Sequence, residues 1–291
     1  MRGDEREEGG AGLLFTPHAS LSPGLIDTHC HLDAAEFAPD RDAVAASAHA
    51  AGVAGIVVPA VTAGNFAAVR ACCVRYPYCV PAYGIHPLFA AGATAADLVT
   101  LRRWLELEFA GAHPPVAIGE IGLDFFVPGF DAARQEHFFV EQLKIARDLG
   151  LPVLLHVRRS QDVILKHLRH VFGRAGTIGG IAHAFNGSRQ QADAFLGLGF
   201  KLGFGGTLTF PRARRIRDLA ATLPLDAIVL ETDAPDMSPE FVGRARNSPE
   251  YLPRIAAVFA GLRGISPALA ARTTSANALA VLPALQRATL P

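Results

Sequence analysis

Residues 25–33 read LIDTHCHLD, a short apolar run that turns polar at its end, where His29 and His31 stand two residues apart. Seven further apolar runs follow, and the intervals between them are long enough to hold a helix. The eight runs cover residues 25–28, 55–58, 80–84, 116–119, 153–155, 179–182, 200–203 and 227–231. Such short runs are typical of parallel strands, which are buried on both faces. Strands that alternate with helices predict a parallel α/β fold.

The helical intervals support this interpretation. Residues 135–149 repeat apolar side chains at helical spacing, and Gly150 ends the pattern. Residues 249–262 and 267–282 predict two more helices after the eighth run. Eight strand–helix units in 291 residues predict a single (β/α)8 barrel of the TIM type. An open doubly wound sheet is the alternative.

Composition narrows the class of protein. The formal net charge is zero, which is unlike proteins that coat nucleic acid through a basic surface. An enzyme that processes a nucleic-acid end inside a pocket is still allowed. The four cysteines fit neither a zinc knuckle nor a disulfide scaffold, so we expect free, buried thiols in a reducing cytoplasm.

The sequence contains no feature that predicts a membrane segment or a protein partner. Residues 1–11 are charged and Gly-rich and do not resemble a signal peptide, so we expect residues 1–22 to form a flexible tail before a barrel over residues 23–291. No stretch approaches the ~18 apolar residues of a membrane span. We therefore expect a cytoplasmic protein with no membrane association and no obligate protein partner.

Polar residues gather at the carboxyl ends of the predicted strands, the end at which barrel enzymes place their chemistry. His29 and His31 point the same way in an extended strand, so they form half of a site for a first-row metal. The alternative is a pair of structural histidines that are satisfied by hydrogen bonds.

Glu120 follows the fourth run in an apolar, Gly-flanked setting. A buried carboxylate is costly unless it is paired or bound to metal, so Glu120 is a candidate bridge between two ions. Its alternative is a loop glutamate on the surface. Asp124, four residues later, is equally compatible with a supporting role and with ordinary loop polarity.

Three further candidate metal ligands stand at the ends of later predicted strands. His156 and His183 each follow an apolar run, and together they resemble the ligands of a second metal ion. Asp233 ends the eighth run and can bind a metal and accept a proton from a bridging water, although an Asx turn before Pro235 is the alternative. His86 and Arg158 are candidates for contact with the substrate, and a structural role for His86 is the alternative.

These segments resemble the TatD family of metal-dependent hydrolases, within the amidohydrolase-type barrels. The matching segments are IDTHCHLD (26–33), GIHP (84–87), GEIGLD (119–124), PVLLHVR (152–158), HAFNGS (183–188) and ETDAP (231–235). The stretch GGTLTFP (205–211) is similar to the YjjV-like branch. Leu88 departs from the pattern, because many members have a polar residue there.

The resemblance implies a dinuclear site. One ion would be held by His29, His31, Glu120 and Asp233, and the other by Glu120, His156 and His183. Related barrels bridge their metals with a carboxylated lysine, but none of the three lysines of this chain stands on the fourth predicted strand. The cofactors would be two divalent ions, with zinc, manganese, cobalt and nickel suiting the imidazole ligands better than magnesium.

Three functions fit these residues. The first is hydrolysis of a phosphate ester, such as a phosphodiester at a DNA end, with Asp233 as the base. The second is hydrolysis of a carboxylic ester, lactone or amide on the same barrel, because fold and metals do not fix the substrate. The third is a non-catalytic metal-binding module, which the complete ligand set disfavours.

Overall fold

The computed structural model describes residues 24–173 and 179–286. Its centre is one sheet of eight parallel strands in chain order. The strands are β1 (Leu25–Asp27), β2 (Val53–Pro59), β3 (Cys79–Tyr83), β4 (Ala117–Asp124), β5 (Val153–Arg158), β6 (Gly180–Ala182), β7 (Phe200–Phe204) and β8 (Ile228–Leu230). The amide of Thr28 donates to the carbonyl of Leu230 at 3.1 Å, which joins the first strand to the last.

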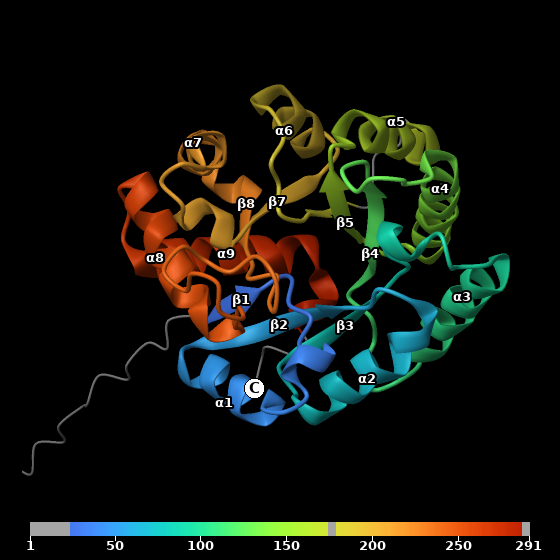
Figure 1. Cartoon of the computed structure of the whole chain (residues 1–291), viewed down its shortest axis with the longest axis horizontal. Helices are drawn as coiled ribbons and strands as arrows, with labels where there is room; N and C mark the ends of the chain where they lie inside the picture. The colour runs from blue at the N-terminus through green and yellow to red at the C-terminus, as the bar shows by residue number, and fades with distance from the viewer. Residues whose placement is uncertain (1–23, 174–178, 287–291) are drawn as a thin grey trace, which may run out of the picture.

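Most of the helices surround the strands as the outer ring of the barrel, and the last helix packs across the amino ends of the strands (Figure 1). They are α1 (Arg41–Ala50), α2 (Phe66–Arg75), α3 (Ala95–Phe109), α4 (Ala132–Leu149), α5 (Gln161–Phe172), α6 (Arg189–Leu196), α7 (Arg214–Thr222), α8 (Leu252–Arg263) and α9 (Pro267–Val281). The predicted TIM-type (β/α)8 barrel is confirmed, and the alternative of an open doubly wound sheet is wrong. The predicted tail, residues 1–22, lies outside the described residues.

Local sequence explains where the helices begin and end. The carboxylate of Asp131 accepts a hydrogen bond from the amide of Arg134 and caps the start of α4. Gly150 ends this helix in the left-handed conformation, with φ of 65°. The helix therefore covers the residues that the spacing predicted, and begins three residues earlier.

The barrel interior is apolar at the amino ends of the strands. Ile26, Val57, Val80 and Leu154 pack there in one buried cluster. The same cluster contains side chains of α9 and the turn after it, namely Ala278, Val281, Leu282 and Leu285. The amino end is thus closed by packing, and the polar side chains are left at the carboxyl end.

The cysteine prediction is confirmed, since Cys30, Cys72, Cys73 and Cys79 are all free and buried. Across the described parts of the chain, no single helix is both long and apolar enough to cross a membrane. One bent pair, Pro249–Arg263 with Pro267–Val281, meets those two criteria of length and composition only.

Candidate metal centre and active site

His29 and His31 leave the carboxyl end of β1 together, as the alternation predicted. Their Nε2 atoms lie 3.3 Å apart. The Nδ1 atom of His31 lies 3.2 Å from the carbonyl oxygen of Pro59. A neutral His31 therefore carries its proton on Nδ1 and presents the Nε2 lone pair to the site.

The loop behind these histidines is held by one side chain. The guanidinium of Arg41 donates hydrogen bonds of 2.8 Å to the carbonyls of Leu32, Asp33 and Ala34. Because these three residues directly follow His31, the arginine fixes the direction in which the chain leaves the site.

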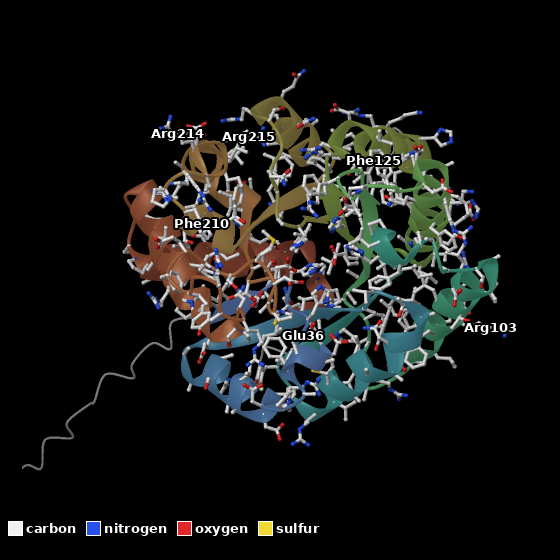
Figure 2. All side chains as sticks on the ribbon, viewed as in Figure 1. Glu36, Arg103, Phe125, Phe210, Arg214 and Arg215 are labelled. Atoms are coloured by element: carbon white, nitrogen blue, oxygen red, sulfur yellow. The ribbon has the colours of Figure 1, made fainter. Side chains whose placement is uncertain are left out.

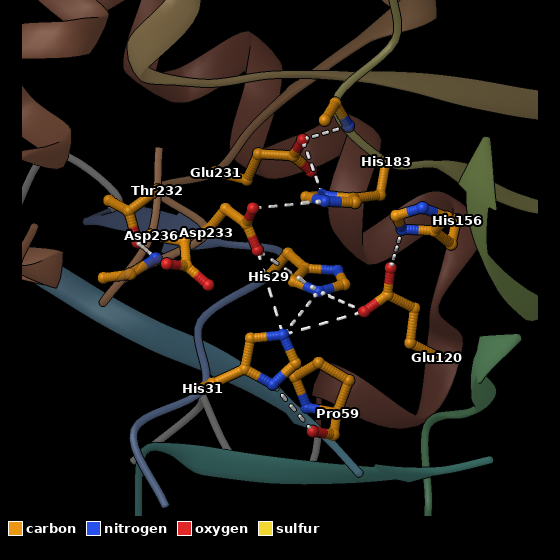
Figure 3. Close-up of polar contacts among 12 residues, drawn as sticks. His29, His31, Pro59, Glu120, His156, His183, Glu231, Thr232, Asp233 and Asp236 are labelled. Carbon is orange, nitrogen blue, oxygen red and sulfur yellow. Dashed lines mark hydrogen bonds and ion pairs between the residues drawn. The ribbon is translucent and has the colours of Figure 1, made fainter. Parts of the chain in front are cut away.

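Glu120 lies on β4 between two groups of imidazoles (Figure 3). Its Oε2 atom is 3.1 Å from Nε2 of His29 and 3.6 Å from Nε2 of His31. Its Oε1 atom is 3.0 Å from Nδ1 of His156. Burial alone would raise the pKa of Glu120, but His29, His86 and the hydrogen-bonded His156 hold it well below its usual value. The carboxylate is therefore an anion that faces both groups.

The carboxylate of Asp233 reaches the same centre from the loop after β8. Its Oδ1 atom is 3.7 Å from Nε2 of His29 and 3.8 Å from Nε2 of His31, and its Oδ2 atom is 3.6 Å from Nε2 of His183. The backbone of Asp233 is left-handed, with φ of 59°, and its amide donates to the carbonyl of His29 at 2.8 Å. Its carboxylate thus faces imidazoles, which disfavours the Asx turn.

His183 follows β6, and its ring stacks on that of His29 with 3.7 Å between centroids. Its Nδ1 atom lies 3.0 Å from Oε1 of Glu231, and the same oxygen accepts a hydrogen bond of 2.6 Å from the amide of Ala184. Glu231 is fully buried directly after β8. The sequence alone predicts no role for Glu231, although an acid directly after an apolar strand is the signal that points to one.

Asp27 is a second buried acid for which the sequence alone predicts no role. Asp27, the last residue of β1, is fully buried and accepts hydrogen bonds from the amide and hydroxyl of Thr232 and from the amide of His29. Burial raises its pKa to about 7. Its contacts join the strand ends that carry His29 and Asp233, which gives it a positioning role.

His86 and Arg158 both line the cavity at this end of the barrel. Nε2 of His86 is 3.0 Å from Nδ1 of His156, while Nδ1 accepts a hydrogen bond from the amide of Leu88. His86 therefore caps the short helix Pro87–Phe89, which is the structural role that we named as the alternative. Its proton is on Nε2, which faces the site. Arg158 lies 3.7 Å from Asp124, with its side chain 44 % exposed.

The donor atoms fit a metal ion. Ligand atoms around a tetrahedral ion with bonds of about 2.1 Å lie about 3.4 Å apart. The distances among His29 Nε2, His31 Nε2 and Glu120 Oε2 are 3.3, 3.1 and 3.6 Å. Imidazole nitrogens and carboxylate oxygens that converge in this way form a donor set for a divalent first-row ion.

The described residues form three groups whose donor atoms lie within 4.8 Å of one another. These groups are His29 with His31 and Asp233, His29 with Glu120 and His183, and His86 with Glu120 and His156. Glu120 belongs to two of them. His156 and His183 share no group, so the assignment of both to a second ion stays a prediction, as does the role of each ligand.

Comparison with known proteins places this arrangement in a family. The family model described as "TatD related DNase" matches residues 26–283. The chain is 44 % identical over 240 residues to the uncharacterized metal-dependent hydrolase YjjV of Escherichia coli K12, covering 82 % of this chain and 90 % of that protein. It is 35 % identical over 261 residues to the 3'-5' ssDNA/RNA exonuclease TatD of Erwinia billingiae, covering 87 % and 97 %.

Solved structures agree with the sequence comparison. The crystal structure of YjjV, a TatD homolog from Escherichia coli K12, matches with a TM-score of 0.84 and 40 % identity, covering 90 % of this chain and 99 % of that one. A hydrolase TatD family protein from Entamoeba histolytica matches with a TM-score of 0.78 at 21 % identity, which shows the fold alone. Because the family model spans the barrel and the YjjV relative covers most of its length, the chain belongs to the TatD family of metal-dependent hydrolases.

Proposed function

We propose that this chain is a phosphodiesterase that uses two divalent ions and removes nucleotides from an end of single-stranded nucleic acid. The observation that carries the proposal is the position of Glu120, whose two oxygens face separate groups of imidazoles. A carboxylate in this position suits two ions, and two ions suit an in-line displacement at phosphorus. A relative at 35 % identity is named as a 3'-5' ssDNA/RNA exonuclease, which favours the nucleic-acid substrate.

When bound, the ions would polarise a phosphoryl oxygen and acidify a water molecule. His29, His31, Glu120 and Asp233 would hold one ion, while Glu120, His156 and His183 would hold the other, with His86 beside the latter. Water then attacks phosphorus, the ester bond breaks, and the products are a phosphomonoester and an alcohol.

The chain's own groups move the protons. Asp233 has a depressed pKa, because the effect of burial is outweighed by His183, His29 and His31, so it is ionised and can accept a proton from the attacking water. Burial lowers the pKa of His86 to about 3, so its ring is neutral and its Nε2–H can donate a hydrogen bond to the leaving oxygen or to a phosphate oxygen. The proton that Asp233 takes from the water can then pass to the leaving alkoxide. Arg158 lines the cavity and supplies a paired hydrogen-bond donor for phosphate.

The alternative is hydrolysis of a lactone, a carboxylic ester or an amide. Leu88 and Met237, two exposed apolar side chains that line the cavity, are the observation that favours it. Rates on bis-p-nitrophenyl phosphate, a 3'-labelled single-stranded oligonucleotide and simple lactones, measured side by side, separate the two. Faster turnover of the phosphodiesters is expected, and a preference for lactones would overturn the proposal.

The substitutions His29→Ala and Asp233→Asn test the catalytic assignment directly. Both are expected to abolish hydrolysis while circular dichroism still shows the barrel. Activity that persists in both variants would contradict the proposed site.

A further inference from the structure

A second cavity of about 600 Å³ adjoins the cavity of about 460 Å³ over the metal centre. Arg158, Asn186 and Ile216 line both of them, so the two cavities share a wall. The second cavity extends from that wall to Phe126, Arg159 and Arg215. A substrate longer than one phosphoester can therefore continue from the metal centre into it.

Positive charge gathers in this second cavity. Over the part of the chain that the structure describes, no carboxylate lies within 4.0 Å of the guanidinium of Arg159 or Arg215. Arg158 has Asp124 at 3.7 Å, but that carboxylate also accepts from His156 at 2.9 Å and from the amide of Phe126 at 2.9 Å. Arg159 and Arg215 therefore have no ionic partner among the described residues, and Arg158 shares its partner with two other donors.

Two of these cations are held against one aromatic ring. The guanidinium carbons of Arg158 and Arg159 lie 3.9 and 4.6 Å from the centroid of Phe126, which is 44 % exposed. Consecutive residues of a strand point to opposite faces, but Arg159 has a φ of 56° and turns the chain at the end of β5. Two like charges near one ring repel each other, and an anion bound beside them relieves that repulsion.

The amino ends of three helices reach the same cavity. Gln161 begins α5, Ser188 caps α6, and Arg215 lies in the first turn of α7, and all three residues line the cavity. The amide groups at a helix amino end attract anions. The nearest acid of these turns, Asp162, accepts a hydrogen bond of 3.0 Å from Gln191 and lines a neighbouring depression instead.

We propose that this cavity binds the backbone phosphate next to the bond that is cleaved, so that the substrate is a single-stranded polynucleotide rather than a small phosphate ester. The proposal rests on the proposed function. Arg159 and Arg215 contact the phosphate, while Phe126 holds the arginines in place and offers its exposed surface to a base.

Arg215 and its neighbour Arg214 provide a matched pair for the test. Both are exposed residues of α7 (Figure 2), but only Arg215 of the two lines the cavity. The substitution Arg215→Ala is expected to raise KM for a single-stranded oligonucleotide roughly tenfold, the effect of a hydrogen bond to a charged group. Bis-p-nitrophenyl phosphate, which has no second phosphate, is hydrolysed at an unchanged rate, and Arg214→Ala changes neither substrate.

Binding to the metal-loaded protein gives a readout that does not depend on turnover. Fluorescence anisotropy is measured with an oligonucleotide whose terminal linkage resists hydrolysis and whose next linkage is either a phosphate or an uncharged methylphosphonate. Wild type is expected to prefer the phosphate, and Arg215→Ala to lose that preference. In Arg215→Ala the dependence of log affinity on log salt concentration becomes shallower by about 0.7, because one phosphate contact is lost.

Phe126 and Phe130 form a second pair, because both are exposed but Phe130 lies outside the cavity and stacks on Phe125. Phe126→Ala is expected to weaken oligonucleotide binding roughly tenfold, as loss of a stacked base does, while Phe130→Ala leaves it unchanged.

The outcomes separate the two proposals. If wild type cleaves phosphodiesters but Arg215→Ala and Arg214→Ala behave alike, the cavity does not bind the neighbouring phosphate and only the further inference fails. If Arg215→Ala slows bis-p-nitrophenyl phosphate as much as the oligonucleotide, the arginine is structural and the inference fails too. If wild type cleaves no phosphodiester at all, the proposed function itself fails.

Discussion

Nε2 of His156 donates a hydrogen bond of 2.9 Å to Asp124, and both Asp124 and Glu120 stand on the same strand, β4. Asp124 must be the acceptor, since the hydrogen bonds from His156 and the amide of Phe126 outweigh burial and lower its pKa to about 2. Nδ1 of His156 lies 3.0 Å from Oε1 of Glu120, to which the protonated ring donates, and in the neutral ring the same atom would present its lone pair to a metal ion. Two carboxylates of β4, Asp124 and Glu120, thus orient the His156 ring through its two nitrogen atoms.

The substitution Asp124→Ala is expected to weaken metal binding by about 10- to 100-fold, as losses of partners behind metal ligands do. Competition with a chromophoric chelator measures the affinity. Asp124→Asn, which keeps an acceptor oxygen, should recover part of the loss. An unchanged affinity in Asp124→Ala would show that the hydrogen bond does not position a ligand.

Gly203 on β7 leaves room for the acid behind His183. A Cβ atom at Gly203 would lie 2.2 Å from Oε2 of Glu231, so Gly203→Ala must displace that carboxylate. We expect a loss of about 1–3 kcal/mol in the free energy of unfolding, together with weaker metal binding.

Gly197→Ala is the control, because its Cβ would meet no atom closer than 3.4 Å. Urea unfolding and metal titration of both variants check the prediction. Equal behaviour of the two variants would contradict the positioning role of Glu231.

Two buried asparagines hold opposite ends of β8. Nδ2 of Asn247 donates to the carbonyls of Thr232 and Asp236 at 2.8 and 2.7 Å, on either side of Asp233. Nδ2 of Asn277 donates to the carbonyls of Leu225 and Ile228 at 2.9 and 2.7 Å, where the strand begins.

Alanine at either position leaves two buried carbonyls without a partner and should cost about 2 kcal/mol or more. Only Asn247→Ala is also expected to lower kcat/KM, by about tenfold or more, because it frees the loop that carries Asp233. Denaturation and steady-state kinetics on both variants measure this. A kinetic defect of equal size in Asn277→Ala would refute the local role of Asn247.

The sequence predicted the barrel well, because each strand is an apolar run that can be identified without knowing which strands it pairs with. It underestimated β4, which continues past Gly119 to Asp124. The apolar pattern breaks at Glu120, and the strand continues because imidazoles from the loop after β1 and from β5 satisfy that buried carboxylate. Gly122 supports the same close packing, since a Cβ there would lie 2.1 Å from the carbonyl oxygen of His156.

The sequence also placed all six predicted ligands at one end of the barrel, where the structure brings them together. It could not reveal the roles of Glu231, Asp27 and Asn247, because these depend on which strand ends are neighbours in space. Likewise, four arginines stand at 212, 214, 215 and 217, and the sequence alone does not distinguish a solvated helix face from a nucleic-acid contact. Among them, only Arg215 lines the second cavity.

Metal affinity is expected to rise with pH. Burial would lower the pKa of His31, but the hydrogen bond and charge of Glu120 raise it to about 9. Below pH 9 the imidazole carries an extra proton, and a metal ion must displace that proton to bind. Burial would also lower the pKa of His183, but Glu231 and Asp233 raise it well above its usual value, so this ring must lose a proton too. Affinity should therefore increase by at least about tenfold per pH unit up to about pH 9.

Isothermal titration at several pH values, in buffers of different ionisation enthalpy, measures both the slope and the proton released. His170→Gln, a change at an exposed histidine of α5, is the control and should leave the slope intact. An affinity that does not change between pH 6.5 and 8.5 would contradict the expected pKa near 9 for His31.

The most direct test of the account is the metal content of the purified protein, with hydrolysis of a 3'-labelled single-stranded oligonucleotide measured before and after chelation. We predict about two divalent ions per chain, cleavage from the end, loss of cleavage with the chelator, and recovery when the metal is restored. A protein that binds no metal tightly, or that cleaves equally well after chelation, would contradict the account.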